Sequence, residues 1–350
     1  MSMAALPTVA VFSTGGTIAS PVQGTAGAIP SLSAQDLLGA VPQLSDVARL
    51  EATTFRQVPS PELRAADLVE LAAAIANRIA AGARGAVVTQ GTDSLEETAF
   101  ALDLLVDGEA PVVLTAAMRN PSLPGADGPA NLLAAVQTAT SEAARGLGCL
   151  AVLNDEVHAA RFVQKKHTSN PATFSSPLTG PIGWIAEGQV RIAVRPVERH
   201  HVEVSPPAQP DAEVALLKSV QGDDGRLVSV IEQLGYRGLV VEAQGGGHLP
   251  SATVEPLQRL AQAMPVVLSS RTGSGELLRT TYGFPGSEKD LLARGLIPAG
   301  ALDGLKSRVL LTLLLMTGAD RMQIEQAFEL VGVPGQGSFR FAAGHHATQS

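Results

Sequence analysis

The chain of 350 residues is poor in cysteine, aromatic residues and lysine, and it contains no long basic run. Its single cysteine, Cys149, excludes a framework of internal disulfide bonds and is typical of a reducing compartment. No segment approaches the roughly 20 consecutive apolar residues of a transmembrane helix, so we expect no membrane partner. The net charge of −8, without a basic run, argues against a nucleic-acid partner.

Targeting and metal-binding signals are also missing. The N-terminus has no basic flank, and its apolar stretch at 3–12 is too short and interrupted for a secretory signal, so we predict a cytoplasmic protein. HExxH, CxxC and GxSxG motifs are absent. The seven histidines show no spacing typical of metal ligands, and we therefore expect neither a metal nor a cofactor.

The chain does have many apolar runs that alternate with helical patterns, and 45% of its residues are hydrophobic, enough for two domains. Its first part predicts a larger N-terminal α/β domain with a doubly wound, mainly parallel sheet. The strands are expected at Val9–Ser13, Ala86–Thr89, Val112–Thr115 and Leu150–Leu153. The helices are expected at Leu68–Ala81, from Ser94 onward with Glu96 and Glu97 in the first turn, and at Pro129–Ala144.

A proline-rich break at Val204–Asp211 indicates a boundary. We predict an N-terminal catalytic domain at 1–205, a linker at 206–212 and a smaller C-terminal α/β domain at 213–350. The second domain is expected to contain three strands (Val214–Leu217, Gly238–Val241, Val266–Ser269) and four helices (Arg226–Leu234, Val254–Met264, Leu305–Thr317, Met322–Val331). The Gly-rich polar tail from Gly332 is expected to be mobile.

Two strand-to-loop junctions carry the strongest functional signal, because each ends in a glycine-threonine step. One reads Thr14-Gly-Gly-Thr17 and the other Gln90-Gly-Thr-Asp93. Ligands bind at the carboxyl ends of strands in an open α/β sheet, so hydroxyls at Thr17 and Thr92 indicate nucleophilic catalysis. The first motif alone fits a phosphate-binding loop equally well, although GxGxxG and Gly-Lys-Ser/Thr patterns are absent.

A threonine hydroxyl is a weak nucleophile and needs activation. Asp93 can accept from a substrate ammonium, and Lys165 is one of only five lysines. A lysine that is desolvated beside a hydroxyl can act as a neutral base, whereas the alternative is a solvated loop. The Gly/Pro/Ala-rich segment Ser20–Ser33 follows the first junction and is interpreted as a lid or, alternatively, as a plain surface loop.

At this point the residues resemble the bacterial-type L-asparaginases and glutaminase-asparaginases. Thr14–Ala19 and Gln90–Ala99 are similar to the two signatures of that family. The similarity continues in order through Leu114–Arg119, Ala126–Leu132, the Lys165 region, Gly245–Pro250, Ser269–Gly273 and Tyr282–Phe284. The resemblance implies a two-domain asparaginase-like fold and hydrolysis of the side-chain amide of L-asparagine to L-aspartate and ammonia, without a metal.

The resemblance also implies roles for individual residues. Thr17 matches the primary nucleophile, whereas Thr92, Asp93 and Lys165 match a second catalytic group. In that group Thr92 orients or activates water, Lys165 tunes its hydroxyl, and Asp93 binds the substrate's α-ammonium. Substrate contacts are implied for Gly16, Ser60, Gly91, Ala117, His248 and Glu276. Ser60 would hold the α-carboxylate.

Family members of this kind place their sites between subunits. The resemblance therefore implies a homodimer or homotetramer in which Glu276, and also His248, border the site of a neighbouring subunit.

Two departures leave the substrate open. The family usually has a tyrosine in the lid, but Gly27 or Ala28 stands there, and the two tyrosines, Tyr236 and Tyr282, lie elsewhere. Pro61 replaces a polar residue beside Ser60. The alternatives are an amidase for glutamine, a D-amino acid amide or a non-amino-acid amide, and a catalytically weakened protein that binds an amino acid.

Overall fold

The computed structural model describes residues 5–16, 18, 32–204 and 212–342. The chain separates into two compact units, residues 1–196 and 197–350. The predicted linker at 206–212 lies outside the described residues except for Ala212. So do the predicted nucleophile Thr17 and most of the segment interpreted as a lid.

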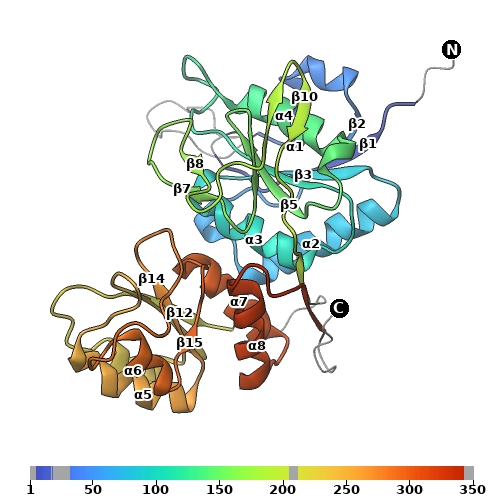
Figure 1. The fold of residues 1–350 in the computed structure, drawn as a ribbon. Coiled ribbons are helices and arrows are strands. Elements are labelled where there is room, and N and C mark those ends of the chain that lie inside the picture. Colours follow the sequence, from blue (N-terminus) through green and yellow to red (C-terminus); the bar gives the residue numbers. More distant parts are fainter. Residues whose placement is uncertain (1–4, 17, 19–31, 205–211, 343–350) are drawn as a thin grey trace. The chain divides into compact units, whose positions relative to one another are not determined.

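An eight-stranded sheet forms the centre of the first unit, in the order β10-β9-β6-β5-β4-β3-β1-β2 (Figure 1). Neighbouring strands from β2 to β5 are parallel, and the remaining three pair antiparallel at one side. The predicted mainly parallel sheet is therefore confirmed. The bounds are β1 Thr8–Ser13, β2 Arg49–Thr54, β3 Gly85–Thr89, β4 Val112–Thr115, β5 Cys149–Leu153, β6 Glu156–Ala159, β9 Gly183–Ala186 and β10 Gln189–Ile192.

Helices cover both faces of this sheet. Because side chains alternate along a strand, Val9 and Val11 of β1 pack with α1 and α4, whereas Ala10 and Phe12 pack with α2 and α3. Strands that are buried on both faces carry continuous apolar runs, which is why these strands were predictable. The helices are α1 Ala34–Gly39, α2 Ala65–Ala80, α3 Leu95–Leu105 and α4 Gly128–Thr140.

Short elements position the loops of the first unit. A two-stranded antiparallel pair, β7 Gln164–Lys165 and β8 Phe174–Ser175, forms a sheet of its own. Single 3-10 turns are η3 Pro42–Asp46, η4 Ser60–Glu62, η5 Thr92–Ser94 and η6 Glu142–Ala144. Two of these turns carry predicted site residues: η4 begins with Ser60, and η5, which directly precedes α3, begins with Thr92.

The second unit is built on a parallel four-stranded sheet, in the order β12-β13-β14-β15. Helix α5 shares a buried cluster with one face, and α7 contacts β12 and β13. A separate parallel pair joins β11 to β16. The bounds are β11 His200–Glu203, β12 Val214–Lys218, η7 Val228–Val230, η8 Glu232–Leu234, β13 Gly238–Ala243, η9 Ser251–Thr253, α5 Val254–Ala263, β14 Val266–Ser270, α6 Glu288–Ala293, β15 Ile297–Pro298, α7 Gly304–Met316, α8 Arg321–Gly332 and β16 Phe339–Ala342.

Two predictions for this unit are wrong. The segment Arg226–Leu234 forms two 3-10 turns instead of one α-helix. Its β-branched residues disfavour the helix, and Gly235, at φ +85°, ends the second turn. The tail predicted to be mobile contains strand β16, because Phe339 and Phe341 are buried and pair this segment with β11.

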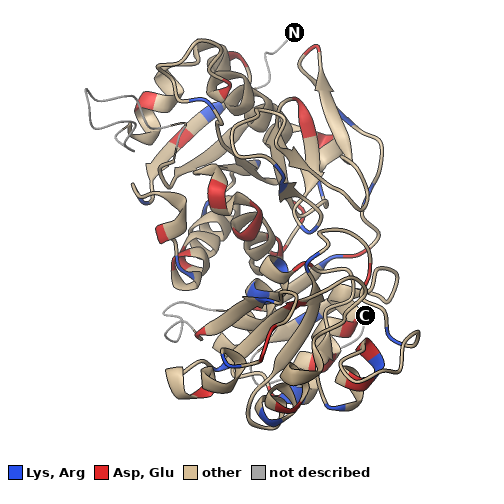
Figure 2. Cartoon of the chain, turned by 90° about the vertical axis from the view of Figure 1, so that its left-hand side faces the viewer, with Lys and Arg blue, Asp and Glu red and all other residues tan. Residues whose placement is uncertain are grey.

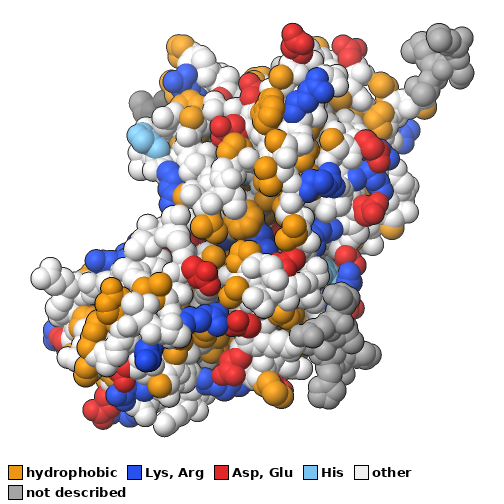
Figure 3. Space-filling model, in the orientation of Figure 1, with side chains coloured by type: hydrophobic (Ala, Val, Ile, Leu, Met, Phe, Trp, Pro, Cys, Tyr) orange, Lys and Arg blue, Asp and Glu red, His pale blue; other side chains and the backbone are white. Residues whose placement is uncertain are grey.

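Charges of both signs are interspersed along both units (Figure 2), and several of them form ion pairs, such as Arg56 with Glu70. Hydrophobic side chains also reach the surface of the second unit (Figure 3), where Leu227 and Leu234 are among the exposed ones. Among the described residues, no helix is both long and apolar enough to span a bilayer.

Candidate active site

The two glycine-threonine junctions meet at the carboxyl ends of neighbouring strands. Strands β1 and β3 pair in parallel with Ser13 opposite Thr89, and the Thr14 N–H donates to the Thr89 carbonyl at 3.0 Å. A Cβ atom built on Gly16 would lie 2.1 Å from the backbone nitrogen of Gly91. Gly16 also has φ +86°, which favours glycine for a second reason. Backbone therefore packs directly on backbone where the sequence predicted a site.

Thr92, Asp93 and Lys165 come together beside this contact. Turn η5 places Thr92 and Asp93 immediately before α3, and Lys165 arrives on β7. The Lys165 Nζ atom lies 2.8 Å from Thr92 Oγ1 and 2.6 Å from Asp93 Oδ1. The Lys165 side chain is 15% exposed and that of Asp93 is 68% exposed. One amine thus links a buried hydroxyl to a carboxylate at the surface.

This arrangement can move a proton. As an ammonium, Nζ donates to both oxygens, and after losing a proton it becomes an acceptor for the Thr92 hydroxyl. The carboxylate of Asp93 is the acidic member of the group and keeps access to solvent.

Ser60 lies against the second junction. It begins turn η4 and is buried, and a Cβ atom built on Gly91 would lie 2.8 Å from its Oγ. The Ser94 hydroxyl donates to the Ser60 carbonyl at 2.9 Å, and the Gln90 side-chain amide donates to Ser94 at 3.3 Å. The turn that carries Ser60 is therefore tied to the turn that carries Thr92.

Ala117 follows β4, the next strand of the sheet, and is buried. Its loop is held from α4: the Asp127 carboxylate accepts from the N–H groups of Met118 and Arg119 at 3.0 and 2.8 Å. The Asn131 amide donates to the Ala116 carbonyl at 2.9 Å and accepts from the N–H of Asn154 at 2.9 Å. Asp127 at the N-cap of α4 and Asn131 within the helix thus fix the backbone around Ala117.

The residues of this support were not predicted as part of the site. The sequence Asp-Gly-Pro-Ala-Asn at 127–131 offered a signal, because a polar residue before Gly-Pro marks a helix start. Asn131 follows Asp127 by four residues, so the two side chains are expected on the same face of the helix. Glu96 was also missed. It is buried and accepts from the Lys165 N–H at 3.1 Å.

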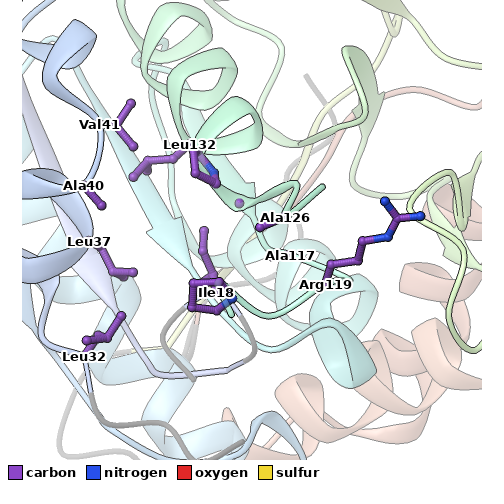
Figure 4. Close-up of a pocket in the computed structure, with 12 residues that line it drawn as sticks. Ile18, Leu32, Leu37, Ala40, Val41, Ala117, Arg119, Ala126 and Leu132 are labelled. Atoms are coloured by element: carbon purple, nitrogen blue, oxygen red, sulfur yellow. The ribbon is translucent and has the colours of Figure 1, made fainter. Parts of the chain in front are cut away.

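An apolar pocket adjoins Ala117 (Figure 4). It is lined by Ile18, by residues of α1 and its flanks, by the loop between β4 and α4, and by the start of α4. The other residues are Leu32, Leu37, Ala40, Val41, Arg119, Pro121, Ala126, Gly128, Pro129 and Leu132. Arg119 is the charged member of this lining, and its guanidinium donates to the Gly125 carbonyl at 3.2 Å. Apart from Arg119, the described residues that line the pocket are apolar and offer it hydrophobic contact.

The other two predicted contact residues belong to the second unit. His248 Nε2 lies 3.3 Å from Oε2 of the fully buried Glu288, and its ring contacts Tyr282 and Phe284 edge-on at 4.8 and 5.2 Å between centroids. Glu288 also accepts from the N–H groups of Thr281 and Tyr282 at 2.7 and 2.6 Å. Glu276 is exposed on the loop before Tyr282.

The pKa of the Glu288 carboxyl lies below its usual value. Burial by itself raises it, but the backbone N–H groups and the neighbouring His248 outweigh that effect. A buried carboxylate therefore stays charged beneath His248 and fixes the loop that carries Tyr282.

Comparison with known proteins places these features in a family. The asparaginase N-terminal domain matches residues 8–198, and the glutaminase/asparaginase C-terminal domain matches residues 213–328. A probable L-asparaginase of Deinococcus radiodurans is 38% identical over 93% of this chain and 98% of its own length. L-asparaginase 2 of Escherichia coli strain K12 is 33% identical over 93% of both chains.

A solved structure agrees with this result. The crystal structure of a probable cytoplasmic L-asparaginase from Campylobacter jejuni superposes with a TM-score of 0.84 at 32% identity, covering 92% of this chain and 99% of that one. A probable periplasmic L-asparaginase of Haemophilus influenzae is 33% identical over 93% of both chains. The sequence similarity and the fold therefore point to the same family.

Proposed function

We propose that this chain, which belongs to the asparaginase family, hydrolyses the side-chain amide of L-asparagine to L-aspartate and ammonia. One observation carries the proposal: a single amine, Lys165 Nζ, lies within hydrogen-bond distance of both the Thr92 hydroxyl and the Asp93 carboxylate. This group stands at the carboxyl end of β3, directly after Gly91, which packs against Gly16. The names of the relatives support asparagine as the substrate.

The reaction is proposed in two halves. The Thr17 hydroxyl attacks the amide carbon, its proton passes to the leaving nitrogen, and the C–N bond breaks to release ammonia. Water then attacks the resulting acyl-threonine ester, and cleavage of the C–O bond restores Thr17. In the second half, Thr92 orients the water while Lys165 takes up and returns a proton through the Thr92 hydroxyl.

Positioning comes from groups at both junctions. Asp93, which is exposed, would bind the substrate's α-ammonium, and Ser60 would hold its α-carboxylate, which brings the amide carbon to the nucleophile. The backbone at Gly16, Gly91 and Ala117 would stabilise negative charge on the amide oxygen. His248 and Glu276 would border the site of a neighbouring copy in a homodimer or homotetramer.

A wider amide specificity is the second candidate, and Pro61 favours it. Pro61 shares turn η4 with Ser60 and offers no side-chain donor to a carboxylate. Weaker recognition of the α-carboxylate would admit glutamine, a D-amino acid amide or a simple aliphatic amide. The intact group around Lys165 argues against a protein that only binds an amino acid.

We also propose a cytoplasmic location and domain boundaries at 1–205 and 213–350. The single cysteine supports the location, as does the word cytoplasmic in the name of the Campylobacter jejuni neighbour, although the Haemophilus influenzae relative is named periplasmic. The matched family regions, which leave a gap between residues 198 and 213, support two domains.

The test is ammonia release by the purified protein from L-asparagine, L-glutamine, both D-isomers and an aliphatic amide. Fast release from L-asparagine that is abolished in Thr17→Ala supports an asparaginase. Release that is faster from another amide supports the second candidate. Normal turnover by Thr17→Ala contradicts the role of Thr17, and no release from any amide contradicts the proposed function.

A further inference from the structure

The strand that carries Lys165 lies outside the eight-stranded sheet. Strand β7 consists of Gln164 and Lys165 and pairs with the two-residue strand β8, in a sheet separate from the eight-stranded one. The hydrogen bonds of the main sheet therefore do not set the distance from Lys165 to Thr92. Val163, fully buried in the core beside α3, anchors the segment on one side.

A buried carboxylate holds the same segment by its backbone. Glu96 is the second residue of α3, is 6% exposed, and accepts from the Lys165 N–H at 3.1 Å. A carboxylate in the first turn of a helix is stabilised by the helix dipole, and hydrogen bonds to a charged acceptor are stronger than neutral ones. Helix α3 is itself rigidly placed, since Leu95, Ala99 and most of its length are buried.

Glu96 also lies only four residues after Thr92 on the same continuous turn-helix segment. That segment therefore contacts both the backbone and the side chain of Lys165. Glu96 accepts from the backbone N–H, whereas Thr92 and Asp93 accept from the side-chain amine. The three contacts close a loop of interactions between η5, the start of α3 and β7. A shift of β7 would lengthen the contact between Nζ and the Thr92 hydroxyl.

We propose that Glu96 is a positioning residue for the proposed amide hydrolysis and that it sets the separation of the Lys165 amine from the Thr92 hydroxyl. This inference rests on the proposed function for its kinetic consequence. Glu96 acts through the lysine backbone and touches neither the substrate nor the reacting atoms. Its loss therefore affects the chemical step more than substrate binding.

The test compares Glu96→Ala with Glu96→Gln, which keeps a side-chain oxygen for the Lys165 N–H. Since a displacement of about 1 Å can lower a rate about 100-fold, we expect Glu96→Ala to lower kcat for L-asparagine about 100-fold with little change in KM. Glu96→Gln should restore most of the loss. Glu97→Ala, on the same helical turn, controls for general effects on the helix start.

A double substitution separates positioning from a structural effect. If Glu96 acts through Lys165, adding Glu96→Ala to Lys165→Met should change kcat by less than about twofold. In the unaltered chain, Glu96→Ala should lower kcat about 100-fold. Equal losses in both backgrounds, or a kcat near that of the unaltered chain for Glu96→Ala, would overturn the inference.

Crystal structures of the two variants test the geometry without any turnover. The distance between Lys165 Nζ and Thr92 Oγ1 should exceed hydrogen-bond length in Glu96→Ala and stay near 2.8 Å in Glu96→Gln. An unchanged distance in Glu96→Ala would contradict the inference whether or not that variant is active. If the unaltered chain releases no ammonia, the proposed function fails, and the crystal structures still decide the role of Glu96.

Discussion

A Cβ atom on Gly16 would lie 2.1 Å from the backbone nitrogen of Gly91, so the two glycine-threonine junctions pack backbone to backbone at this point. This contact joins the end of β1 to the end of β3. It brings the segment leading to Thr17 against the segment leading to Thr92. This close approach, rather than a need for loop flexibility, explains why both positions are glycine.

Replacing Gly16 by alanine should therefore remove both activity and stability. Gly82 provides a matched control, because it has φ +103° but nothing within 4 Å of an added Cβ. Gly82→Ala should cost about 1 kcal/mol of unfolding free energy, the penalty of the left-handed conformation alone. Thermal unfolding and ammonia release check both variants. Equal stability losses would show that the contact with Gly91 is unimportant.

The Thr92 hydroxyl should be needed for the chemical step. Thr92→Val removes the hydroxyl and keeps the shape, and it should lower kcat about 100-fold, a loss typical of removing one proton-transfer group. Thr89→Val is the control, because Thr89 is also buried near this strand end and its Oγ1 has no hydrogen-bond partner among the residues that the structure describes. That variant should keep kcat within about twofold. The prediction fails if the two variants have similar kcat values.

Asn131 should stabilise the loop around Ala117. Asn131→Ala leaves the Ala116 carbonyl and the Asn154 N–H without this partner, and it should cost about 3 kcal/mol of unfolding free energy. If Ala117 contacts the substrate, KM should rise as well. Chemical denaturation and steady-state kinetics test the two effects. A loss of stability below about 0.5 kcal/mol would contradict the bridging role.

His158 should make the stability of the first unit depend on pH. Burial lowers its pKa below 6.5, although the neighbouring Glu156 partly opposes this, and its Nδ1 lies 3.0 Å from the Ser176 hydroxyl. Just below pH 6.5 the unfolded chain binds more protons than the folded one, so the free energy of unfolding falls as pH decreases through this range.

His158→Gln should remove that contribution. The decrease in melting temperature between about pH 7.5 and 5.5 should become smaller than in the unaltered chain, because glutamine does not titrate. Thermal unfolding across this range is the measurement. An identical decrease in both proteins would show that His158 does not contribute.

The sequence predicted the parts of the fold whose residues are buried on both faces. Strand β3, for example, is a continuous apolar run between two layers of helices. Strand β2 was not predicted, because it lies at the edge of the sheet and its sequence, Arg-Leu-Glu-Ala-Thr-Thr, is only half buried. The antiparallel strands β6, β9 and β10 are similarly short and carry mixed patterns.

Part of the site was likewise predictable from the sequence, and part was not. The motifs indicated Thr92, Asp93 and Lys165, and the structure places Lys165 Nζ within 2.8 Å of both Thr92 Oγ1 and Asp93 Oδ1. Glu96 was not predicted as part of the site, because a glutamate in the first turn of a helix is ordinarily explained by the helix dipole alone. Only the fold shows that its carboxylate meets a backbone 69 residues away.

The most direct test of the account compares Lys165→Met with Lys166→Met in turnover of L-asparagine. The two lysines are adjacent, but only Lys165 reaches Thr92 and Asp93, whereas the Lys166 side chain is exposed. With both variants folded, Lys165→Met should lose at least about 100-fold in kcat, and Lys166→Met should stay within about twofold. A Lys165→Met variant with a kcat within about twofold of the unaltered chain would contradict the proposed catalytic group.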